Sequence, residues 1–324
     1  MNDSKHSPLV SVVIPCYNAE QWIESTLQSV RAQTYRNIEI IVVNDGSTDS
    51  SEARIRTFDH PRLTLVTQPN RGQTAALNRG VSLSSGDFTQ YLDADDLLHP
   101  EKIERQLRLL EGNGGCIATS EWARFSDEIR TARFVPDDNW RDLDPVEWLI
   151  SAWRDGGGML FPAQWLIPRE IVERAGPWRE DLTLNNDAEY FTRAVLAARR
   201  ILFCEGARAY YRSGIQGSLS GLKSRAAWIS QQKVIEACVE YLLNREDSDR
   251  TRRVASLLWR RFAHTTYPYD RQIANDALRH AGALHPVSVM PEGGAFFRLT
   301  MRILGWKAAT VIRRFYYRFR YGYA

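Results

Sequence analysis

The stretch Gln90-Tyr91-Leu92-Asp93-Ala94-Asp95-Asp96 carries three carboxylates within four residues. Phe88, Tyr91 and Leu92 favour a strand, so the carboxylates should lie where a buried strand emerges at the rim of a sheet. A bound cation offsets their mutual repulsion, and Mg²⁺ or Mn²⁺ prefers oxygen ligands and keeps positions open for a phosphate-bearing substrate. The alternative is an acidic turn that caps the helix expected from Glu101.

Strand and helix patterns alternate along the first 125 residues. Uninterrupted apolar strands joined by helices predict an α/β fold whose mostly parallel sheet is covered on both faces. Because proline cannot donate to a strand ladder, the first strand should stop at Pro15. The predicted strands are 9–14, 38–43, 63–66 and a run ending at Asp93, and the predicted helices are 20–33, a short one after Asp49, and 72–84.

The loops that follow four predicted strands are polar and should share one rim, where parallel sheets bind their ligands. Tyr17 can stack on a base, Asp45 can accept from a ring N–H, and Arg71 can meet a phosphate. With the carboxylates they describe a nucleotide-diphosphate pocket. Each also has an ordinary alternative, as core, turn or loop. The sequence contains no GKS or GKT phosphate loop and no G-x-G-x-x-G after the first strand, which argues against NTPases and dinucleotide oxidoreductases.

Four ordered motifs closely resemble those of family 2 glycosyltransferases. They are Val13-Ile14-Pro15-Cys16-Tyr17-Asn18, Val42-Val43-Asn44-Asp45-Gly46-Ser47-Thr48-Asp49, Asn70-Arg71-Gly72 with Ala76-Leu77-Asn78-Arg79-Gly80, and Tyr91-Leu92-Asp93-Ala94-Asp95-Asp96. The resemblance covers about residues 9 to 220 and implies a GT-A domain over 1–222. In that domain 9–125 is the nucleotide-sugar half and 126–222 the acceptor half.

The resemblance also implies roles for individual residues. Tyr17 lies against the base, Asp45 bonds the uracil ring, and Asp95 contacts Mn²⁺ or Mg²⁺ directly. Asp93 serves the ribose or the metal, and Asp96 supports the site from behind or caps a helix. Further donor-binding positions are Pro15, Asn18, Asn70, Arg71 and Asn78.

A second acidic position opens the helix predicted after Leu184. Asn186 or Asp187 can be only its cap, with Glu189 in the first turn. By the resemblance, Asp187 is the general base that deprotonates an acceptor hydroxyl, Asn186 replaces the usual glutamate, and Glu189 is a less favoured base. A carboxylate at a helix start is a weak base unless its surroundings raise its pKa. The implied reaction is a single displacement that inverts configuration.

The segment Tyr211 to Ser220 resembles the family's mobile loop beside the diphosphate. The histidine that commonly joins the metal there is missing, although Arg212 can contact phosphate. The Gln-x-x-Arg-Trp signature of processive synthases is also missing, so transfer of a single sugar is expected. The alternatives are a catalytically silent nucleotide-sugar or glycan-binding protein, and a sugar-1-phosphate nucleotidyltransferase.

The C-terminal third should be helical, with an extension over 223–285 and a basic amphipathic tail over 286–324. The tail reads as one helix with an apolar stripe that includes Phe297, Met301, Leu304 and Phe315. Basic borders on such a stripe favour membrane contact, and packing on protein or binding of RNA are the alternatives. Seven basic and no acidic residues follow Ala295: Arg298, Arg302, Lys307, Arg313, Arg314, Arg318 and Arg320.

Composition and cysteine spacing bear on location. A hydrophobic fraction of 44% with 25% charged residues is ordinary for a globular protein, and the four cysteines stand far apart, as in a reducing compartment. With no apolar signal core and no long apolar run, the chain is expected in the cytoplasm, on the inner face of the cell membrane. The expected partners are a UDP-sugar donor and a glycan or lipid-linked acceptor, as in surface polysaccharide assembly, and no nucleic acid.

Overall fold

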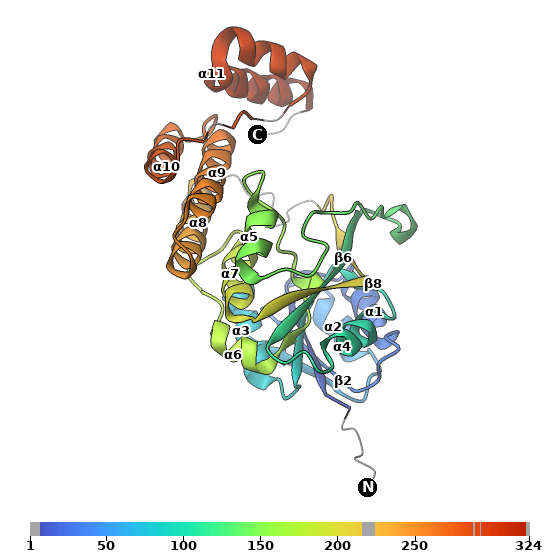
Figure 1. The fold of residues 1–324 in the computed structure, drawn as a ribbon. Coiled ribbons are helices and arrows are strands. Elements are labelled where there is room, and N and C mark those ends of the chain that lie inside the picture. Colours follow the sequence, from blue (N-terminus) through green and yellow to red (C-terminus); the bar gives the residue numbers. More distant parts are fainter. Residues whose placement is uncertain (1–6, 216–223, 288, 292, 322–324) are drawn as a thin grey trace. The chain divides into compact units, whose positions relative to one another are not determined.

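The computed structural model describes residues 7–215, 224–287, 289–291 and 293–321 (Figure 1). Their contacts form two compact units, one of Met1–Trp148 with Leu160–Gly221 and one of Leu149–Met159 with Leu222–Ala324. The sequence places residues 149–159 in the acceptor half, whereas their contacts group them with the C-terminal helices. A Cβ on Gly156 would lie 2.8 Å from the Leu257 carbonyl, so this passage requires glycine.

The first unit is built on a five-stranded sheet in the order β3-β2-β1-β4-β7. β1 (Val10–Cys16), β2 (Ile38–Asn44), β3 (Leu63–Thr67) and β4 (Phe88–Tyr91) are parallel, and β7 (Ile167–Pro168) is antiparallel to β4. Every residue of β1 is buried, as expected for a central strand covered on both faces. The predicted α/β fold with a mostly parallel sheet is confirmed.

Pro15 lies inside β1, so the prediction that the strand stops there is wrong. Alternate residues of β1 turn their backbone groups toward β4, as Val13 does when its carbonyl accepts from Leu92 N at 3.1 Å. Pro15 is the next residue of that set, and β4 has already ended at Tyr91. Its missing N–H therefore costs no ladder bond, while pairing with β2 continues to Cys16 opposite Asn44.

Helices cover both faces of this sheet (Figure 1). α1 (Ile23–Arg31) and α2 (Ser51–Arg56) lie on one side and α3 (Gln73–Leu83) lies on the other. α3 approaches the sheet closely because Gly80 has no side chain: a Cβ there would lie 2.4 Å from Val13 Cγ1.

A second, three-stranded sheet has the order β5-β8-β6. It consists of β5 (Leu97–Leu98), β6 (Cys116–Phe125) and β8 (Arg200–Arg212). The remaining elements of the first unit are α4 (Lys102–Leu110), η1 (Ile129–Thr131), η2 (Pro162–Gln164), α6 (Arg169–Ala175) and α7 (Asn186–Ala197), and α5 (Pro145–Trp153) runs across the boundary between the units. Because β5 begins one residue after Asp96, its pairing with β8 brings the end of β8 to the acidic stretch.

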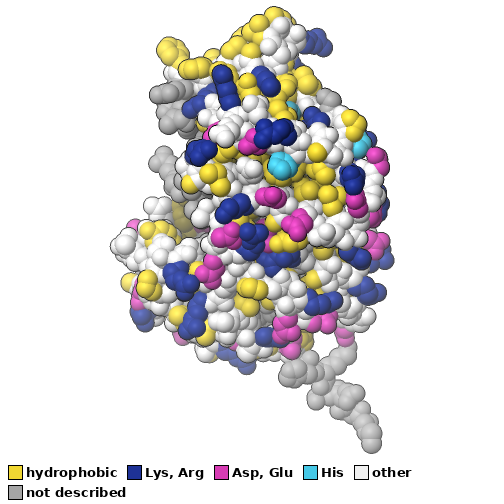
Figure 2. Space-filling model, turned by 90° about the vertical axis from the view of Figure 1, so that its left-hand side faces the viewer, with side chains coloured by type: hydrophobic (Ala, Val, Ile, Leu, Met, Phe, Trp, Pro, Cys, Tyr) yellow, Lys and Arg dark blue, Asp and Glu magenta, His cyan; other side chains and the backbone are white. Residues whose placement is uncertain are grey.

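The second unit is helical, as predicted, and besides the end of α5 it contains α8 (Arg225–Arg245), α9 (Asp249–Thr266), α10 (Arg271–Leu284) and α11 (Ala295–Tyr321). The prediction that the tail forms one helix is wrong. Gly305 leaves the helical region at φ 77° and ψ 160°, so α11 is two helices (Figure 1). Hydrophobic and basic side chains gather over α11, at the top of Figure 2. Among the described helices, none is long and apolar enough to cross a membrane.

Candidate active site

The loops after β1 and β2 are joined through Asn18. Its backbone N–H donates to Ser47 Oγ at 3.0 Å, and its Oδ1 accepts from Thr48 N at 2.8 Å. Asn18 has a φ of 49°, a left-handed conformation that asparagine tolerates better than most residues. The preceding Tyr17 is 51% exposed, which excludes the alternative that it packs in the core. Its ring therefore remains available to a planar ligand.

Asp45 holds the loop that follows β3. Its Oδ1 accepts from Gln68 Nε2 at 2.8 Å and from Arg71 N at 2.9 Å, and its Oδ2 accepts from Gly72 N at 2.8 Å. The side chain is buried, and these donors compensate its charge. A carboxylate offers about four acceptor positions, so Asp45 fixes this loop and retains capacity for a further donor.

The three carboxylates after β4 lie in different surroundings. Asp93 and Asp95 are half-buried, whereas Asp96 is fully buried and accepts from Arg212 N at 2.8 Å. Among the described residues, Asp96 Oδ2 has no hydrogen-bond partner. Burial, followed by the charges of Asp95 and Asp187, raises the pKa of Asp93 to about 7, and burial also raises the pKa of Asp95. A bound cation would stabilise the ionised form of these carboxylates.

The donor set at this position suits a hard divalent ion. Asp93 and Asp95 offer carboxylate oxygens, which Mg²⁺ and Mn²⁺ prefer, and two protein ligands leave positions for phosphate oxygens and water. No group of three or more His, Cys, Asp or Glu residues in the described part of the chain is arranged to hold a metal by itself.

Arg212 lies behind the acidic stretch. Its Nε donates to the Asp95 carbonyl at 2.8 Å, and its guanidinium lies over the rings of Trp22 at 4.6 Å and Phe125 at 4.4 Å. It is 7% exposed, and its charge favours the ionised form of Asp95. The structure thus shows Arg212 supporting the carboxylates, and its predicted contact with phosphate stays a prediction. Residues 216–220, the second half of the predicted mobile loop, lie outside the described residues.

Asp187 lies in the first turn of α7, beside the carboxylates of the first sheet. The hydroxyls of Tyr91 and Tyr190 are 2.7 Å apart, which ties α7 to the end of β4. Burial raises the pKa of Asp187 to about 6, although its Oδ1 accepts from Ala188 N at 2.8 Å. The charge of Asp187 in turn raises the pKa of Asp93. The predicted base and the predicted metal ligands therefore belong to one site.

Gln73, which sequence reasoning missed, connects these groups. It begins α3, donates from Nε2 to Asp93 Oδ1 at 2.8 Å, and accepts at Oε1 from Asn186 Nδ2 at 3.3 Å. Its place directly after Gly72, on the rim of strand ends, was the available signal. One amide thus links the carboxylate after β4 to the helix that carries Asp187.

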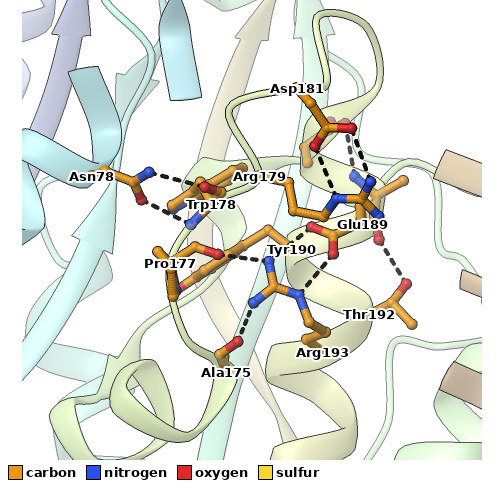
Figure 3. Close-up of polar contacts among 12 residues, drawn as sticks. Asn78, Ala175, Pro177, Trp178, Arg179, Asp181, Glu189, Tyr190, Thr192 and Arg193 are labelled. Atoms are coloured by element: carbon orange, nitrogen blue, oxygen red, sulfur yellow. Dashed lines mark hydrogen bonds and ion pairs between the residues drawn. The ribbon is translucent and has the colours of Figure 1, made fainter. Parts of the chain in front are cut away.

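A loop before α7 is fastened to α3 by Asn78 (Figure 3). Asn78 Oδ1 accepts from Trp178 N at 2.8 Å, and its Nδ2 donates to Trp178 O at 2.9 Å and Glu180 Oε1 at 3.1 Å. Arg71 donates to Glu180 Oε2 at 3.0 Å, while Asn70 is exposed. The side-chain amide of Asn78, a residue predicted to bind the donor, thus donates both of its hydrogen bonds to this loop.

Glu189, the less favoured base, is fully buried and paired with Arg193. Arg193 donates from Nε to one carboxylate oxygen and from Nη2 to the other, each at 2.8 Å. The guanidinium also donates to the carbonyls of Ala175 and Pro177 (Figure 3). This network fastens α7 to the end of α6, so Glu189 has a structural role.

Comparisons with known proteins identify the family of this chain. The family model described as glycosyl transferase family 2 matches residues 11–176. Uncharacterized glycosyltransferase RT0329 of Rickettsia typhi is 30% identical over 214 residues, 62% of this chain and 66% of the relative. Putative glycosyltransferase EpsH of Bacillus subtilis is 30% identical over 211 residues, 64% of this chain and 61% of the relative. The alignments thus span slightly less than two thirds of these relatives.

Solved structures share the fold. S. aureus TarS 1–349 in complex with UDP-GlcNAc superposes with a TM-score of 0.69 at 16% identity, covering 97% of this chain and 92% of TarS 1–349. The mannosyltransferase PcManGT from Pyrobaculum calidifontis in complex with GDP-Man and Mn²⁺ superposes with a TM-score of 0.54 at 17% identity, covering 96% of this chain and 88% of PcManGT.

Proposed function

Because the chain belongs to glycosyl transferase family 2 and has the GT-A fold, we propose that it moves a single sugar from a UDP-sugar to an acceptor hydroxyl. One observation carries the proposal. Two carboxylates suited to a metal and a third suited to proton abstraction meet at the carboxyl end of β4 and the start of α7. In a sugar transfer with a diphosphate leaving group, a base assists the attacking hydroxyl and a metal neutralises the departing diphosphate.

In the proposed donor site, Tyr17 stacks on the uracil ring and Asp45 accepts from its N–H with its remaining capacity. The exposure of Tyr17 and the fixed position of Asp45 support these roles. Asn18 and Asn70 border the proposed site from neighbouring loops. Arg71 would contact the phosphates once its hydrogen bond to Glu180 is broken. TarS has been solved with UDP and with UDP-GlcNAc, which supports UDP as the nucleotide.

In the proposed reaction, Asp187 takes the proton of the acceptor hydroxyl while that oxygen attacks the anomeric carbon. The new carbon–oxygen bond forms as the bond to the diphosphate breaks, so configuration inverts and UDP departs. A pKa of about 6 suits this role because the carboxylate is ionised at neutral pH and is a stronger base than an exposed aspartate.

We propose that Asp95, with Asp93, holds Mn²⁺ or Mg²⁺ together with the donor diphosphate. When bound, the ion neutralises the charge that develops on the leaving group. The raised pKa values of both carboxylates and the Mn²⁺ complex of PcManGT support this assignment. Arg212 positions the Asp95 backbone from behind.

We propose further that the acceptor is a glycan or lipid-linked glycan of surface polysaccharide assembly, and that the protein acts at the cytoplasmic face of the cell membrane. All four cysteines are buried, which is compatible with a reducing compartment. The seven basic and no acidic residues after Ala295 favour an anionic surface.

The test is calorimetric titration of UDP and GDP into the purified protein with Mn²⁺ and with EDTA. We expect UDP binding that requires Mn²⁺ and is lost in Asp95→Ala, and unchanged binding in the control Asp59→Ala, an exposed aspartate outside the site. An absence of nucleotide binding under every condition would overturn the donor site. Binding of UDP without turnover of any donor would instead favour a catalytically silent binding protein.

A further inference from the structure

The C-terminal helix pair is a hairpin, here called the α11 hairpin (residues 295–321). Its halves run on either side of Gly305, and Figure 1 shows them side by side. Phe297, Met301 and Ala309 form a buried cluster, and the guanidinium of Arg313 lies 4.1 Å from the Phe297 ring centre. Contacts between residues on both sides of the turn therefore hold the hairpin together.

The second half of the hairpin packs on the end of α9. The ring of Trp306 lies 4.6 Å from His264 and 5.2 Å from Tyr267. Four and eight residues further on, Thr310 is buried and Arg314 donates to the Pro268 carbonyl. Residues spaced by four share one helix face, so this face is covered by protein.

The opposite face of each half is apolar and exposed. Phe296, Leu299 and Ile303 follow the i, i+3, i+7 pattern of one helix face, with exposed fractions of 71%, 55% and 71%. The second half repeats the pattern with Ile312, Phe315 and Phe319, of which Phe319 is 96% exposed. Leu299 and Ile303 are each two residues, about half a turn, from buried Met301, and Ile312 is two residues from buried Thr310. Exposed apolar stripes of this kind mark interaction surfaces.

The charge of this segment selects the partner. Arg298, Arg302 and Lys307 are exposed beside the stripes, and the described residues of the hairpin include no aspartate or glutamate. Basic and hydrophobic side chains lie together at the top of Figure 2. A second copy of the hairpin would bring like charges together, which opposes self-association through this face. Arginine and lysine beside aromatic and aliphatic side chains instead match an anionic headgroup layer over acyl chains.

We propose that the α11 hairpin docks on a bilayer rich in anionic phospholipid. Phe296, Leu299 and Ile303 enter the boundary between headgroups and acyl chains together with the stripe of the second half, and the basic side chains contact lipid phosphates. This inference rests on the proposed membrane location and is independent of the proposed chemistry.

The experiment is co-sedimentation of the full-length protein with vesicles of phosphatidylcholine, with and without about one-third phosphatidylglycerol. We expect at least tenfold tighter binding to the anionic vesicles, weakening with added salt because exposed charges are screened. Leu299→Ser with Ile303→Ser should weaken binding at least tenfold. Arg302→Gln with Lys307→Gln should weaken it by about fivefold for each charge removed.

Matched controls lie in the first unit. Ile129→Ser with Val135→Ser removes aliphatic side chains of similar exposure, 43% and 72%, and Arg133→Gln with Arg141→Gln removes two exposed charges. Both should bind vesicles as the parent does. A parent that stays in the supernatant with anionic vesicles overturns the proposal, as does a dimer that Leu299→Ser with Ile303→Ser dissociates without any vesicle binding. UDP calorimetry on the same variants separates this outcome from failure of the donor site.

Discussion

The proposed role of Asp187 as a base depends on where α7 begins. At an exposed helix start its anion would be stabilised, and its pKa would lie near or below the ordinary value. Burial outweighs this effect and raises the pKa from 3.8 to about 6. The surroundings of the side chain, and not its residue type, therefore make it a suitable acceptor for a hydroxyl proton.

Activity should therefore depend on pH through Asp187. At saturating Mn²⁺, which keeps the Asp93 carboxylate ionised, Asp187 becomes protonated below about pH 6, so kcat/KM should fall about tenfold for each further pH unit, with a plateau above pH 7. Asp187→Asn should lower kcat by about 10²- to 10⁴-fold and leave UDP affinity unchanged, whereas Asp59→Asn should match the parent. Initial rates of UDP release across pH test this, and a profile that stays flat down to pH 4.5 would contradict it.

Gln73 links the Asp93 carboxylate to Asn186, the residue directly before Asp187. Its amide donates to Asp93 and accepts from Asn186, so it relates the donor side of the site to the start of α7. Gln73→Leu should lower kcat about ten- to a hundredfold, because a small displacement of the base is costly, while the Kd for UDP changes less than about threefold. Gln28→Leu on α1 is the control. Equal losses in kcat and UDP affinity would show that Gln73 binds the donor instead.

At the scale of elements, the loops of the site are held by polar contacts between secondary structures. Asn18 joins the loops after β1 and β2, Asp45 fixes the loop after β3, and Asn78 fastens the loop before α7 to α3. Three of the predicted donor-site residues thus also hold the rim in shape. The close packing of α3 on the sheet is part of this arrangement, because α3 carries both Gln73 and Asn78.

Gly80 should be the sensitive point of that packing. In Gly80→Ala the new Cβ would lie 2.4 Å from Val13 Cγ1, so α3 must shift, and the free energy of unfolding should fall by about 1–3 kcal/mol. Gly282→Ala on α10 meets nothing within 4 Å and should raise it by about 0.5–1 kcal/mol through helix propensity. Denaturant unfolding followed by circular dichroism compares the two variants. A Gly80→Ala protein as stable as the parent would contradict the packing argument.

At the scale of the whole molecule, the two units differ in character. The first unit holds the proposed donor site and base, whereas the second unit carries the basic α11 hairpin. A net charge of +3 conceals this difference, because the segment after Ala295 alone contributes seven basic residues. The two proposals therefore concern separate parts of the chain and are tested by separate variants.

The sequence by itself determined the parallel sheet and the family. Buried strands have continuous apolar runs that can be recognised in the sequence. Each of the four family motifs lies within one short stretch of the chain, so it can be recognised without knowledge of the fold. The sequence also identified Asp93, Asp95 and Asp187 as candidate site residues, because they are acidic residues at the ends of predicted strands and helices. The continuation of β1 through Pro15 was not predicted, because it depends on where the neighbouring strand β4 ends.

Only the tertiary structure decided the remaining features. The pairing of β5 with β8 brings Arg212 to the acidic stretch from 116 residues away, and no local pattern encodes that contact. The link through Gln73, the raised pKa of Asp187 and the outward stripes of the α11 hairpin likewise depend on which surfaces become buried. Burial and long-range hydrogen bonding are properties of the assembled fold, so they become visible only when distant segments meet.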